Sequence, residues 1–506
     1  MSEKLIGVMK INIKILFLIN FVGLISLLPI KNVAQTDSIP VDVRQQMETF
    51  LQALNSGETA EIEKFIRGSH HPKVLEQVPM DLMLARWLTV HNQTGPVEAR
   101  IFKNLSPNTA AVWTRGTITK VWVGFQFFFE KDEPHRITTI ARDSGPMPPI
   151  KERLAPAKTP SQLASRMNQY LDEIGKTPYF SGSVLIAHKG KPILNRSLGK
   201  ANSAQNIPNQ PNTVFNIASI SKIFVSTAIA QLAEKGLLNY QDKLSKFIPE
   251  YPKHIADQVT IHHLLTHTSG IELDEIREFN EKTAKAESVK DLIDAQIEFL
   301  PKLENYQNFK LPEEYNYTNE GYALLARIIE IVSKKNYFDY LRENILKPAK
   351  MQDAHIFYQT VPPKNLSTGY TNQNPVNGVS MLGAPREVSL FNQGFHHPAG
   401  GIDSTTTDLL RFFNSLLNGK LLKKQSLKLM MQSHVKVAEG RFYGYGLMID
   451  ETTAGKRIGH SGANMGFSSR LDYYPDSDYT VIVLCNQDRV ANSMADLVAE
   501  LLSGTI

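Results

Sequence analysis

The chain has 506 residues, of which 42% are hydrophobic and 21% charged, an ordinary composition for a globular protein of more than one domain. Its formal net charge is +5 at pH 7. Residues 1–34 contain four lysines and one glutamate, a net +3, so 5 − 3 leaves +2 for the remainder. Because no basic stripe with interleaved aromatic residues follows, the sequence argues against nucleic acid as a partner.

The N-terminus has the pattern of an export signal. Lysines precede the apolar run of residues 15–30, and a cleavage site is expected after Ala34. The run is short for a membrane span, so we expect no stable span after the signal peptide, residues 1–34, is removed. Asn32 is larger than the residue usual two places before the cut, which keeps a retained N-terminal anchor as the alternative. A bacterial periplasmic or secreted location is therefore predicted.

Residues 38–145 predict a small α+β domain. An amphipathic helix spans residues 41–54, a second surrounds Ile62, and alternating apolar residues from Val121 to Phe129 indicate a strand. Helices followed by an antiparallel sheet resemble cystatin-like, nuclear-transport-factor-like domains. No group of titratable residues suggests chemistry here, and the domain is interpreted as an accessory or dimerisation module, which makes a homo-oligomer through it an expectation. Three of its histidines, at positions 70, 71 and 91, are interpreted as loop residues rather than metal ligands.

The proline-rich residues 146–160 are interpreted as a semi-rigid linker, and residues 161–506 as a second domain. Its early and late elements are predicted as a helix at 161–174, a hairpin of 182–188 and 192–198, strands at 469–474 and 479–484, and a helix at 491–502. Because a mostly helical middle separates them, we expect one sheet that joins both ends of the domain. The single cysteine, Cys485, is predicted to be a buried strand residue.

Ser219 and Lys222 carry the clearest chemical signal. Ser219 is expected to open a long apolar helix that stops at Gly236, and Lys222 lies one turn further on the same face. A serine becomes a nucleophile when a neighbouring base accepts its proton, and a lysine can be that base where burial and the helix dipole favour the neutral amine. The Ser219 N–H, unpaired at a helix start, can face a developing oxyanion.

Two further motifs follow in the chain. Tyr317-Thr-Asn319 immediately precedes an apolar helix, and His460-Ser-Gly462 precedes the late strands. Each of the three motifs recurs elsewhere in the chain and is weak alone, so their order carries the argument. Residues 260–270 predict a short helix that closes at Gly270. Its His263 and His267 are four residues apart, but no glutamate occupies the place that a zinc protease uses, and no metal site is predicted.

In this order the motifs resemble those of the serine β-lactamase and penicillin-recognising superfamily. The nearest branch holds class C β-lactamases, D-alanyl-D-alanine carboxypeptidases, D-aminopeptidases and related esterases. Residues 264–270, 398–404 and 443–447 support the resemblance, which covers about residues 165–505. It implies an α+β fold of the β-lactamase/transpeptidase type, with an antiparallel sheet flanked by helices and a helical subdomain, and it implies no metal or organic cofactor.

The resemblance also implies roles for individual residues. Ser219 would be the acylated nucleophile, and Lys222 would share a proton with Tyr317. Tyr317 would act as general base and later as the acid for the leaving group. Asn319 would hydrogen-bond the substrate amide, and the N–H groups of Ser219 and Ala463 would form the oxyanion hole.

One motif departs from the family pattern. Class C β-lactamases and many carboxypeptidases have Lys-Thr-Gly where this chain has His460-Ser461-Gly462, and that lysine helps to bind a substrate carboxylate. A histidine offers a weaker, pH-dependent contact, so KM for acidic substrates would rise between pH 6 and 8 if His460 bound them as a cation. The other interpretation is that His460 supports its neighbours without touching substrate.

The sequence as a whole predicts an exported serine hydrolase that forms an acyl-enzyme with a small peptide, amide or ester, because the histidine variant fits a peptidase or esterase better than a β-lactamase. Two alternatives stay open: a β-lactamase proper, and a sensor that acylates or binds its ligand without turnover.

Overall fold

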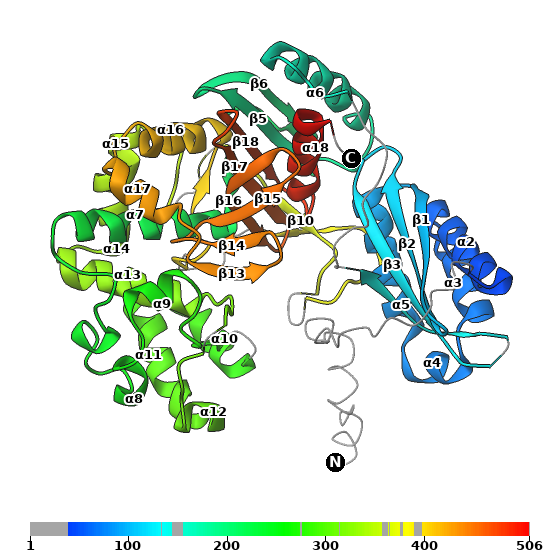
Figure 1. The fold of residues 1–506 in the computed structure, drawn as a ribbon, viewed down its shortest axis with the longest axis horizontal. Helices are drawn as coiled ribbons and strands as arrows, with labels where there is room; N and C mark the ends of the chain where they lie inside the picture. Colours follow the sequence, from blue (N-terminus) through cyan, green and yellow to red (C-terminus); the bar gives the residue numbers. More distant parts are fainter. Residues whose placement is uncertain are drawn as a thin grey trace. The chain divides into compact units, whose positions relative to one another are not determined.

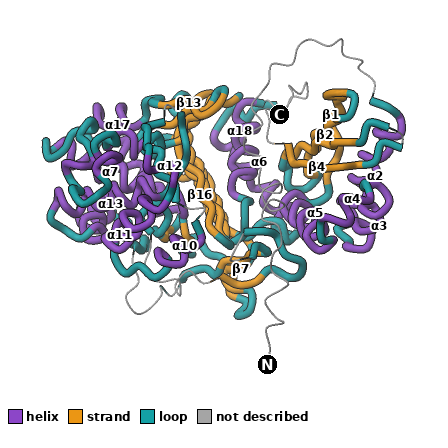
Figure 2. The backbone as a smooth tube through the Cα atoms, turned by 90° about the horizontal axis from the view of Figure 1, so that it is seen from below, coloured by secondary structure: helices purple, strands orange, loops and turns teal. Residues whose placement is uncertain are grey.

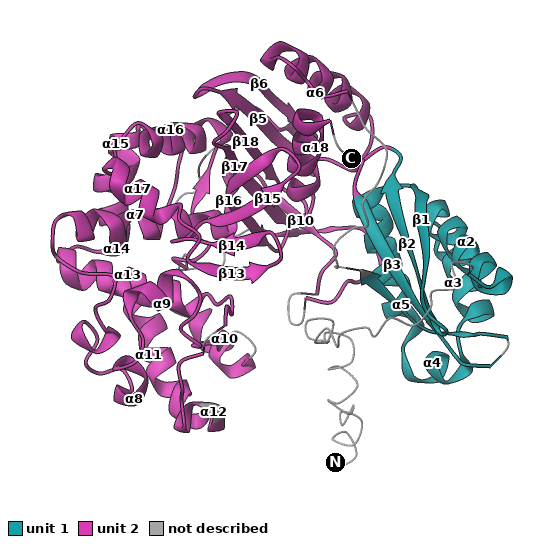
Figure 3. Ribbon diagram, in the orientation of Figure 1, with its two compact units in different colours: residues 1–117, 122–149 teal, residues 118–121, 150–506 magenta. Residues whose placement is uncertain are grey.

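The computed structural model describes residues 39–504 except 133, 144–154, 274–275, 313, 357–362, 364, 375–377 and 389–396. The chain divides into two compact units, one of residues 1–117 and 122–149 and one of residues 118–121 and 150–506 (Figure 3). The predicted signal peptide and most of the predicted linker lie outside the described residues. Within the described part, no helix is long and apolar enough to cross a membrane.

The first unit is a small α+β domain, as predicted. Its elements are α2 (Val41–Ser56), α3 (Thr59–Ser69), α4 (Pro72–Gln77), α5 (Met80–Thr94), β1 (Val97–Ser106), β2 (Thr109–Gly116), β3 (Trp122–Phe129) and β4 (Ile137–Asp143). The strands form an antiparallel sheet in the order β1-β2-β3-β4. Phe50 of α2 packs edge-on against Phe125 and Phe127 of β3, which lie on the buried face that the alternation predicted.

One histidine of this unit is placed differently from the prediction. His91 lies within α5 and contacts the Leu54 carbonyl at 2.8 Å, so it is a helix residue rather than a loop residue. His71 is the N-cap of α4, where its ring accepts a hydrogen bond from the Lys73 N–H. In the described part of the chain, no three His, Cys, Asp or Glu side chains are arranged to hold a metal ion.

The second unit is built on an antiparallel sheet that joins both ends of the domain, which confirms the prediction. Among the described residues its strand order is β13-β14-β15-β16-β17-β18-β5-β6. These strands are β5 (Gly182–His188), β6 (Lys191–Leu198), β13 (Val435–Ala438), β14 (Arg441–Tyr443), β15 (Met448–Thr452), β16 (Gly455–Asn464), β17 (Phe467–Tyr474) and β18 (Tyr479–Cys485). Lys189 and Gly190 both have positive φ, the requirement of the tight turn that joins β5 to β6. Cys485 is fully buried in β18, as expected.

Helices cover both faces of this sheet (Figures 1 and 2). On one face lie α6 (Pro160–Ile174) and α18 (Ala491–Ser503), which share an apolar core with β5 and β18. On the other lies a helical subdomain comprising α7 (Ser221–Glu234), α8 (Lys253–Ala256), α9 (Ile261–Leu265), α10 (Arg277–Thr283), α11 (Val289–Phe299), α12 (Glu304–Gln307), α13 (Glu320–Ser333), α14 (Tyr337–Leu341), the π-helical turn η4 (Arg342–Leu346), α15 (Lys347–Ala349), α16 (Thr406–Leu417) and α17 (Lys424–Met430).

Helix α7 runs through the centre of this subdomain. Its residues are apolar on nearly every side and are buried from Ser221 to Ala230, the pattern of a helix surrounded by protein. Phe224 stacks on Phe412 of α16 with ring centroids 3.9 Å apart. Three short pairings connect the loops: β7 (Lys200–Asn202) with β8 (Ile207–Pro208), β9 (Phe215–Asn216) with β12 (Asp403–Ser404), and β10 (Gly369–Thr371) with β11 (Arg386–Val388).

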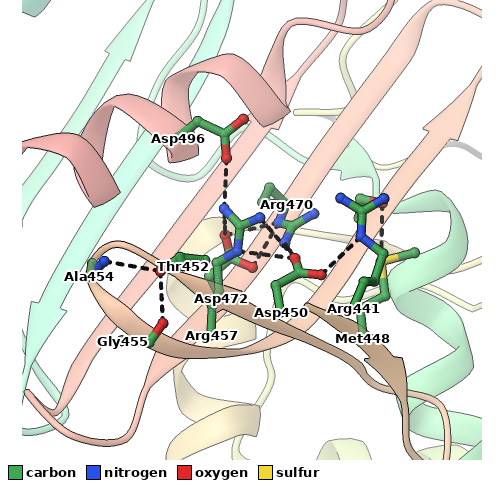
Figure 4. Close-up of polar contacts among 11 residues, drawn as sticks. Arg441, Met448, Asp450, Thr452, Ala454, Gly455, Arg457, Arg470, Asp472 and Asp496 are labelled. Carbon is green, nitrogen blue, oxygen red and sulfur yellow. Dashed lines mark hydrogen bonds and ion pairs between the residues drawn. The ribbon is translucent and has the colours of Figure 1, made fainter. Parts of the chain in front are cut away.

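A buried ion network ties together the strands that lead to the site (Figure 4). Arg457 of β16 binds Asp450 of β15 at 2.8 Å and Asp496 of α18 at 2.7 Å. Arg470 of β17 binds Asp472 at 2.7 Å and Asp450 at 3.3 Å. Burial alone would raise the pKa of Asp450, but Arg457 and Arg470 hold it below its usual value. The network therefore fixes the register of β15, β16 and β17 with charges that are costly to leave unpaired.

Arg457→Met should lower the free energy of unfolding by about 3–5 kcal/mol, because buried carboxylates lose their partner. The matched control is Arg441→Met, since Arg441 pairs with the same Asp450 but is 59% exposed, and it should cost less than about 1 kcal/mol. Chemical denaturation of the full chain measures both values. Equal losses for the two variants would contradict this account of the network.

Candidate active site

Ser219 lies on a short 3₁₀ turn, η1 (Ala218–Ile220), directly before α7. The sequence predicted a helix that opens at Ser219, and the structure starts the α-helix two residues later. Ala218 has φ 45°, a conformation that is strained for a residue other than glycine. The turn is held because the Ala218 N–H donates to Asn216 Oδ1 at 3.1 Å and the Ile217 N–H donates to the Ile402 carbonyl at 2.9 Å. The backbone thus presents Ser219 at a fixed, half-buried position.

Lys222 is fully buried beneath the serine. Its Nζ donates to Ser219 Oγ at 3.1 Å, to Asn319 Oδ1 at 2.9 Å and to the Ala399 carbonyl at 3.1 Å. Three oxygen acceptors match the three N–H groups of an ammonium ion. The same Nζ lies 4.7 Å from the centre of the Tyr317 ring, where the aromatic face attracts a cation. These dipoles and the ring face offset the cost of burying the charge.

Tyr317 completes the group around the serine. Its hydroxyl donates to Ser219 Oγ at 2.8 Å. Asn319 occupies the N-cap position of α13, but its side chain makes no capping hydrogen bond and instead accepts from Lys222. Ser219 and Tyr317, 98 residues apart in the chain, therefore converge in space with Lys222 and Asn319, as the motif order predicted.

Strand β16 passes close to the serine turn. A Cβ on Gly462 would lie 2.4 Å from the Ile217 carbonyl and 2.4 Å from Ser469 Oγ, so only glycine allows this approach. The Ser469 hydroxyl donates to the same Ile217 carbonyl at 2.7 Å. The next residue, Ala463, is exposed, whereas Gly462 is buried. The predicted oxyanion residue thus follows the point of tightest contact between β16 and the turn that carries Ser219. Ser461, also predicted, is half-buried and its Oγ contacts Met448 Sδ at 3.7 Å.

His460 is placed in a way that argues against a cationic contact with substrate. The side chain is fully buried, with Nε2 2.9 Å from the Tyr443 hydroxyl and Nδ1 2.5 Å from the Ser461 carbonyl. Burial, reinforced by the nearby Lys222 ammonium, lowers the pKa of His460 to about 3. The imidazole is therefore neutral between pH 6 and 8, and KM for acidic substrates has no reason to follow its titration there. The geometry favours the alternative that His460 supports its neighbours.

The helix predicted to close at Gly270 ends earlier, and this changes where its two histidines lie relative to each other. Helix α9 ends at Leu265, so His263 and His267 do not share a helical face. His263 belongs to the N-terminal capping box of α9 with Thr260. His267 has φ 57°, and its ring packs against the Tyr317 ring with centroids 4.2 Å apart.

Three contributors to the site were missed by sequence reasoning. They are the Ala399 carbonyl, which accepts from Lys222, the His267 ring beside Tyr317, and the Tyr443 hydroxyl, which contacts His460. Each lies in one of the stretches that supported the family resemblance, at 398–404, 264–270 and 443–447. A backbone carbonyl leaves no residue-type signature, so those stretches were the available signal.

A family model described as Beta-lactamase matches residues 167–503, which is more than half of the chain and lies within the second unit. The chain belongs to the β-lactamase family. It is a serine hydrolase of this β-lactamase-related family, as the motifs predicted. The family match begins after the first unit and says nothing of that unit's role.

Relatives of this family support the assignment. A penicillin-binding protein of Bacillus subtilis (strain 168) is 31% identical over 327 residues, which are 63% of this chain and 70% of that protein. The structure of a penicillin-binding protein from Bacillus halodurans is 27% identical with a TM-score of 0.55 and covers 67% of this chain and 99% of its own. An octameric penicillin-binding protein homologue from Pyrococcus abyssi is also 27% identical, with a TM-score of 0.56, and covers 66% and 76%.

Gly462→Ala should reduce turnover by about 10²-fold or more, because β16 must move away from the Ser219 turn to accommodate the methyl group. Gly400→Ala is the matched control, since a Cβ there meets its nearest atom, the Ala218 carbonyl carbon, at 3.7 Å. Steady-state rates of the two purified variants give the comparison. Wild-type activity in Gly462→Ala would show that the close approach is not required.

The buried His460 should make the protein less stable in acid. An unfolded histidine has a pKa near 6.5, whereas folding lowers that of His460 to about 3. Between these values the unfolded chain binds more protons, so the free energy of unfolding falls as the pH drops below about 6.5, by up to about 1.4 kcal/mol per pH unit. Denaturant midpoints at pH 7 and pH 5 should therefore differ less in His460→Gln than in the wild type. Identical pH slopes would refute this contribution.

Proposed function

We propose that this serine hydrolase forms an acyl-enzyme on Ser219 with a small peptide, amide or ester as its substrate. The observation that carries the proposal is the position of Ser219 Oγ, 2.8 Å from the Tyr317 hydroxyl and 3.1 Å from Lys222 Nζ. Both distances are within reach for direct proton transfer. A nucleophile beside a base that is itself oriented by a third group is the arrangement that activates a serine.

In acylation, Tyr317 first releases its own proton to solvent, and the resulting phenolate takes the proton of Ser219 as Oγ attacks the substrate carbonyl. Lys222 keeps its protons on its three acceptors and, as a cation over the Tyr317 ring, favours the phenolate. The developing negative charge on the carbonyl oxygen faces the N–H groups of Ser219 and Ala463. Tyr317 then returns the proton to the leaving amine or alcohol, which departs and leaves the ester on Ser219.

In deacylation, a water molecule replaces the leaving group and Tyr317 takes a proton from it. The water attacks the ester carbonyl, and Ser219 leaves with a proton from Tyr317. Asn319 orients the substrate throughout. Because its Oδ1 accepts from Lys222, the group that suits a substrate carbonyl is its Nδ2 donor.

The burial of His460 supports a substrate without an essential carboxylate. At the position where the resemblance gives class C β-lactamases and many carboxypeptidases a lysine, this chain has a neutral imidazole directed into the protein. A peptidase acting on D-amino-acid peptides, an amidase or an esterase fits this feature better than a β-lactamase proper. The motifs at residues 1–34 support export of the enzyme, to the periplasm or beyond the cell.

The binding alternative has its own support. Relatives in Bacillus subtilis and Bacillus halodurans are named for penicillin binding, and the first unit lies outside the family match. A protein that acylates and then reports on its ligand would use the same serine without turnover. The octameric Pyrococcus abyssi homologue also makes a homo-oligomer worth measuring, with the first unit as the proposed contact.

The function is tested by turnover of three compounds: a penicillin, a D-alanyl peptide and a short-chain p-nitrophenyl ester. We expect hydrolysis of the ester or the peptide by the wild type. Single-turnover acylation by Tyr317→Phe should be slower by about 10²-fold or more, because the proton of Ser219 loses its acceptor.

Tyr315→Phe is the matched control for this experiment. It removes the same hydroxyl group two residues away, on a side chain that makes no hydrogen bond to Ser219 within the described part of the chain, and it should acylate at about the wild-type rate. Near-wild-type acylation in Tyr317→Phe would refute the role of Tyr317 as general base. Adducts that form without release of product would favour the binding protein.

A further inference from the structure

A chain of hydrogen bonds through buried rings joins the segment that holds the proposed base to the strand that holds the proposed oxyanion hole. The Thr318 N–H donates to His267 Nδ1 at 3.2 Å, and His267 Nε2 lies 3.2 Å from the Tyr443 hydroxyl. Tyr443 in turn lies 2.9 Å from His460 Nε2, and His460 Nδ1 lies 2.5 Å from the Ser461 carbonyl. The three side chains are at most 1% exposed.

The two ends of this chain fix the direction of every hydrogen bond in it. A backbone N–H can only donate, so His267 Nδ1 is an acceptor and its proton is on Nε2. That proton is given to the Tyr443 oxygen, and the Tyr443 hydroxyl donates to His460 Nε2. The proton of His460 is then on Nδ1, facing the Ser461 carbonyl, which can only accept. The donors run one way from Thr318 to Ser461.

Both imidazoles are neutral at physiological pH, as this order requires. Burial lowers the pKa of His267 well below its usual value and that of His460 to about 3. The charged groups that act on the two rings are Lys222, Arg470 and Asp450. A proton added to either ring would be repelled by the positive charge of Lys222. It would also break the one-way order of the hydrogen bonds.

His267 is tied to the segment of Tyr317 in two further ways. Its carbonyl accepts from the Asn316 N–H at 2.8 Å, and its ring packs on the Tyr317 ring. Its φ of 57° is a strained conformation that persists where surrounding contacts enforce it. At the other end, Ser461 lies two residues before Ala463 on β16.

We propose that Tyr443 is a positioning residue, whose hydroxyl links the fixed tautomers of His267 and His460 and thereby holds Tyr317 relative to Ala463. The proposal rests on the acyl-enzyme function above. Tyr443 is fully buried, and its hydroxyl contacts the two imidazoles. It holds the base and the oxyanion donor in one arrangement, which matters because a displacement of about 1 Å between such groups can cost about 10²-fold in rate.

The first test reads the tautomers in the full-length wild type, by ¹⁵N NMR of histidine-labelled protein at pH 7. His267→Gln and His460→Gln assign the two signals. We expect His267 to carry its proton on Nε2 and His460 on Nδ1. An Nε2-protonated or doubly protonated His460 would overturn the proposal, whatever the activity of the enzyme.

The second test is the kinetics of Tyr443→Phe, with Tyr445→Phe as the matched control. Tyr445→Phe loses the same hydroxyl group, but the hydrogen-bond partner of that hydroxyl is His262, which does not belong to the series of hydrogen-bonded rings. In Tyr443→Phe we expect kcat to fall about tenfold to a hundredfold with KM within about twofold, the signature of an interaction used in the transition state. A residue that only fills space would lower Tm and leave kcat unchanged.

The outcomes separate this proposal from the function on which it rests. A wild type that hydrolyses substrate, with Tyr443→Phe within about twofold of its kcat, overturns the positioning role alone. A wild type that neither hydrolyses nor acylates overturns the proposed function and this role with it. Loss of kcat in Tyr443→Phe but not in Tyr445→Phe supports both.

Discussion

The active site depends on one buried ammonium ion. Lys222 has no exposed surface, and its Nζ reaches acceptors on three separate segments: the serine turn, the start of α13 and the loop at Ala399. A charge buried in this way is tolerated because those oxygens meet its protons, and leaving any of them unmet is costly. The same lysine that contacts the proposed nucleophile therefore also connects the segments that surround it.

The sheet forms the remaining wall of the site, and its two faces make different contacts. Toward the helical subdomain, β16 approaches the Ser219 turn so closely that position 462 must be glycine. On the side of α18, the ion network of Arg457 and Arg470 connects β15, β16 and β17. A slip of one residue in β16 would send His460 to the opposite face and move Ala463 away from the serine. Charged groups that make no contact with Ser219 thus set the register on which the proposed oxyanion hole relies.

The sequence could predict the convergence of Ser219, Lys222, Tyr317 and Asn319 because each lies near the start of a helix that periodicity reveals. The sheet that joins both ends of the domain could be predicted because strand-like runs occur near both ends of the domain's sequence. The sequence could not show which way His460 points, since a one-residue change in the register of β16 turns the side chain to the other face and leaves the motif unchanged. The Ala399 carbonyl and the backbone of His267 act through main-chain geometry, which residue types do not encode. The end of α9 at Leu265 was missed because the αL conformation of His267 stops the helix before Gly270.

The central claim is that Ser219 carries the acyl group, and peptide mapping tests it most directly. Trypsin should release residues 201–222 as one peptide, because no lysine or arginine interrupts them. The full chain and Ser219→Ala would be exposed briefly to the penicillin, the D-alanyl peptide and the p-nitrophenyl ester, quenched in acid and digested. The account predicts added mass on this peptide, placed on Ser219 by fragmentation and absent from Ser219→Ala. Added mass on another residue, or neither adduct nor product with any of the three compounds, would contradict it.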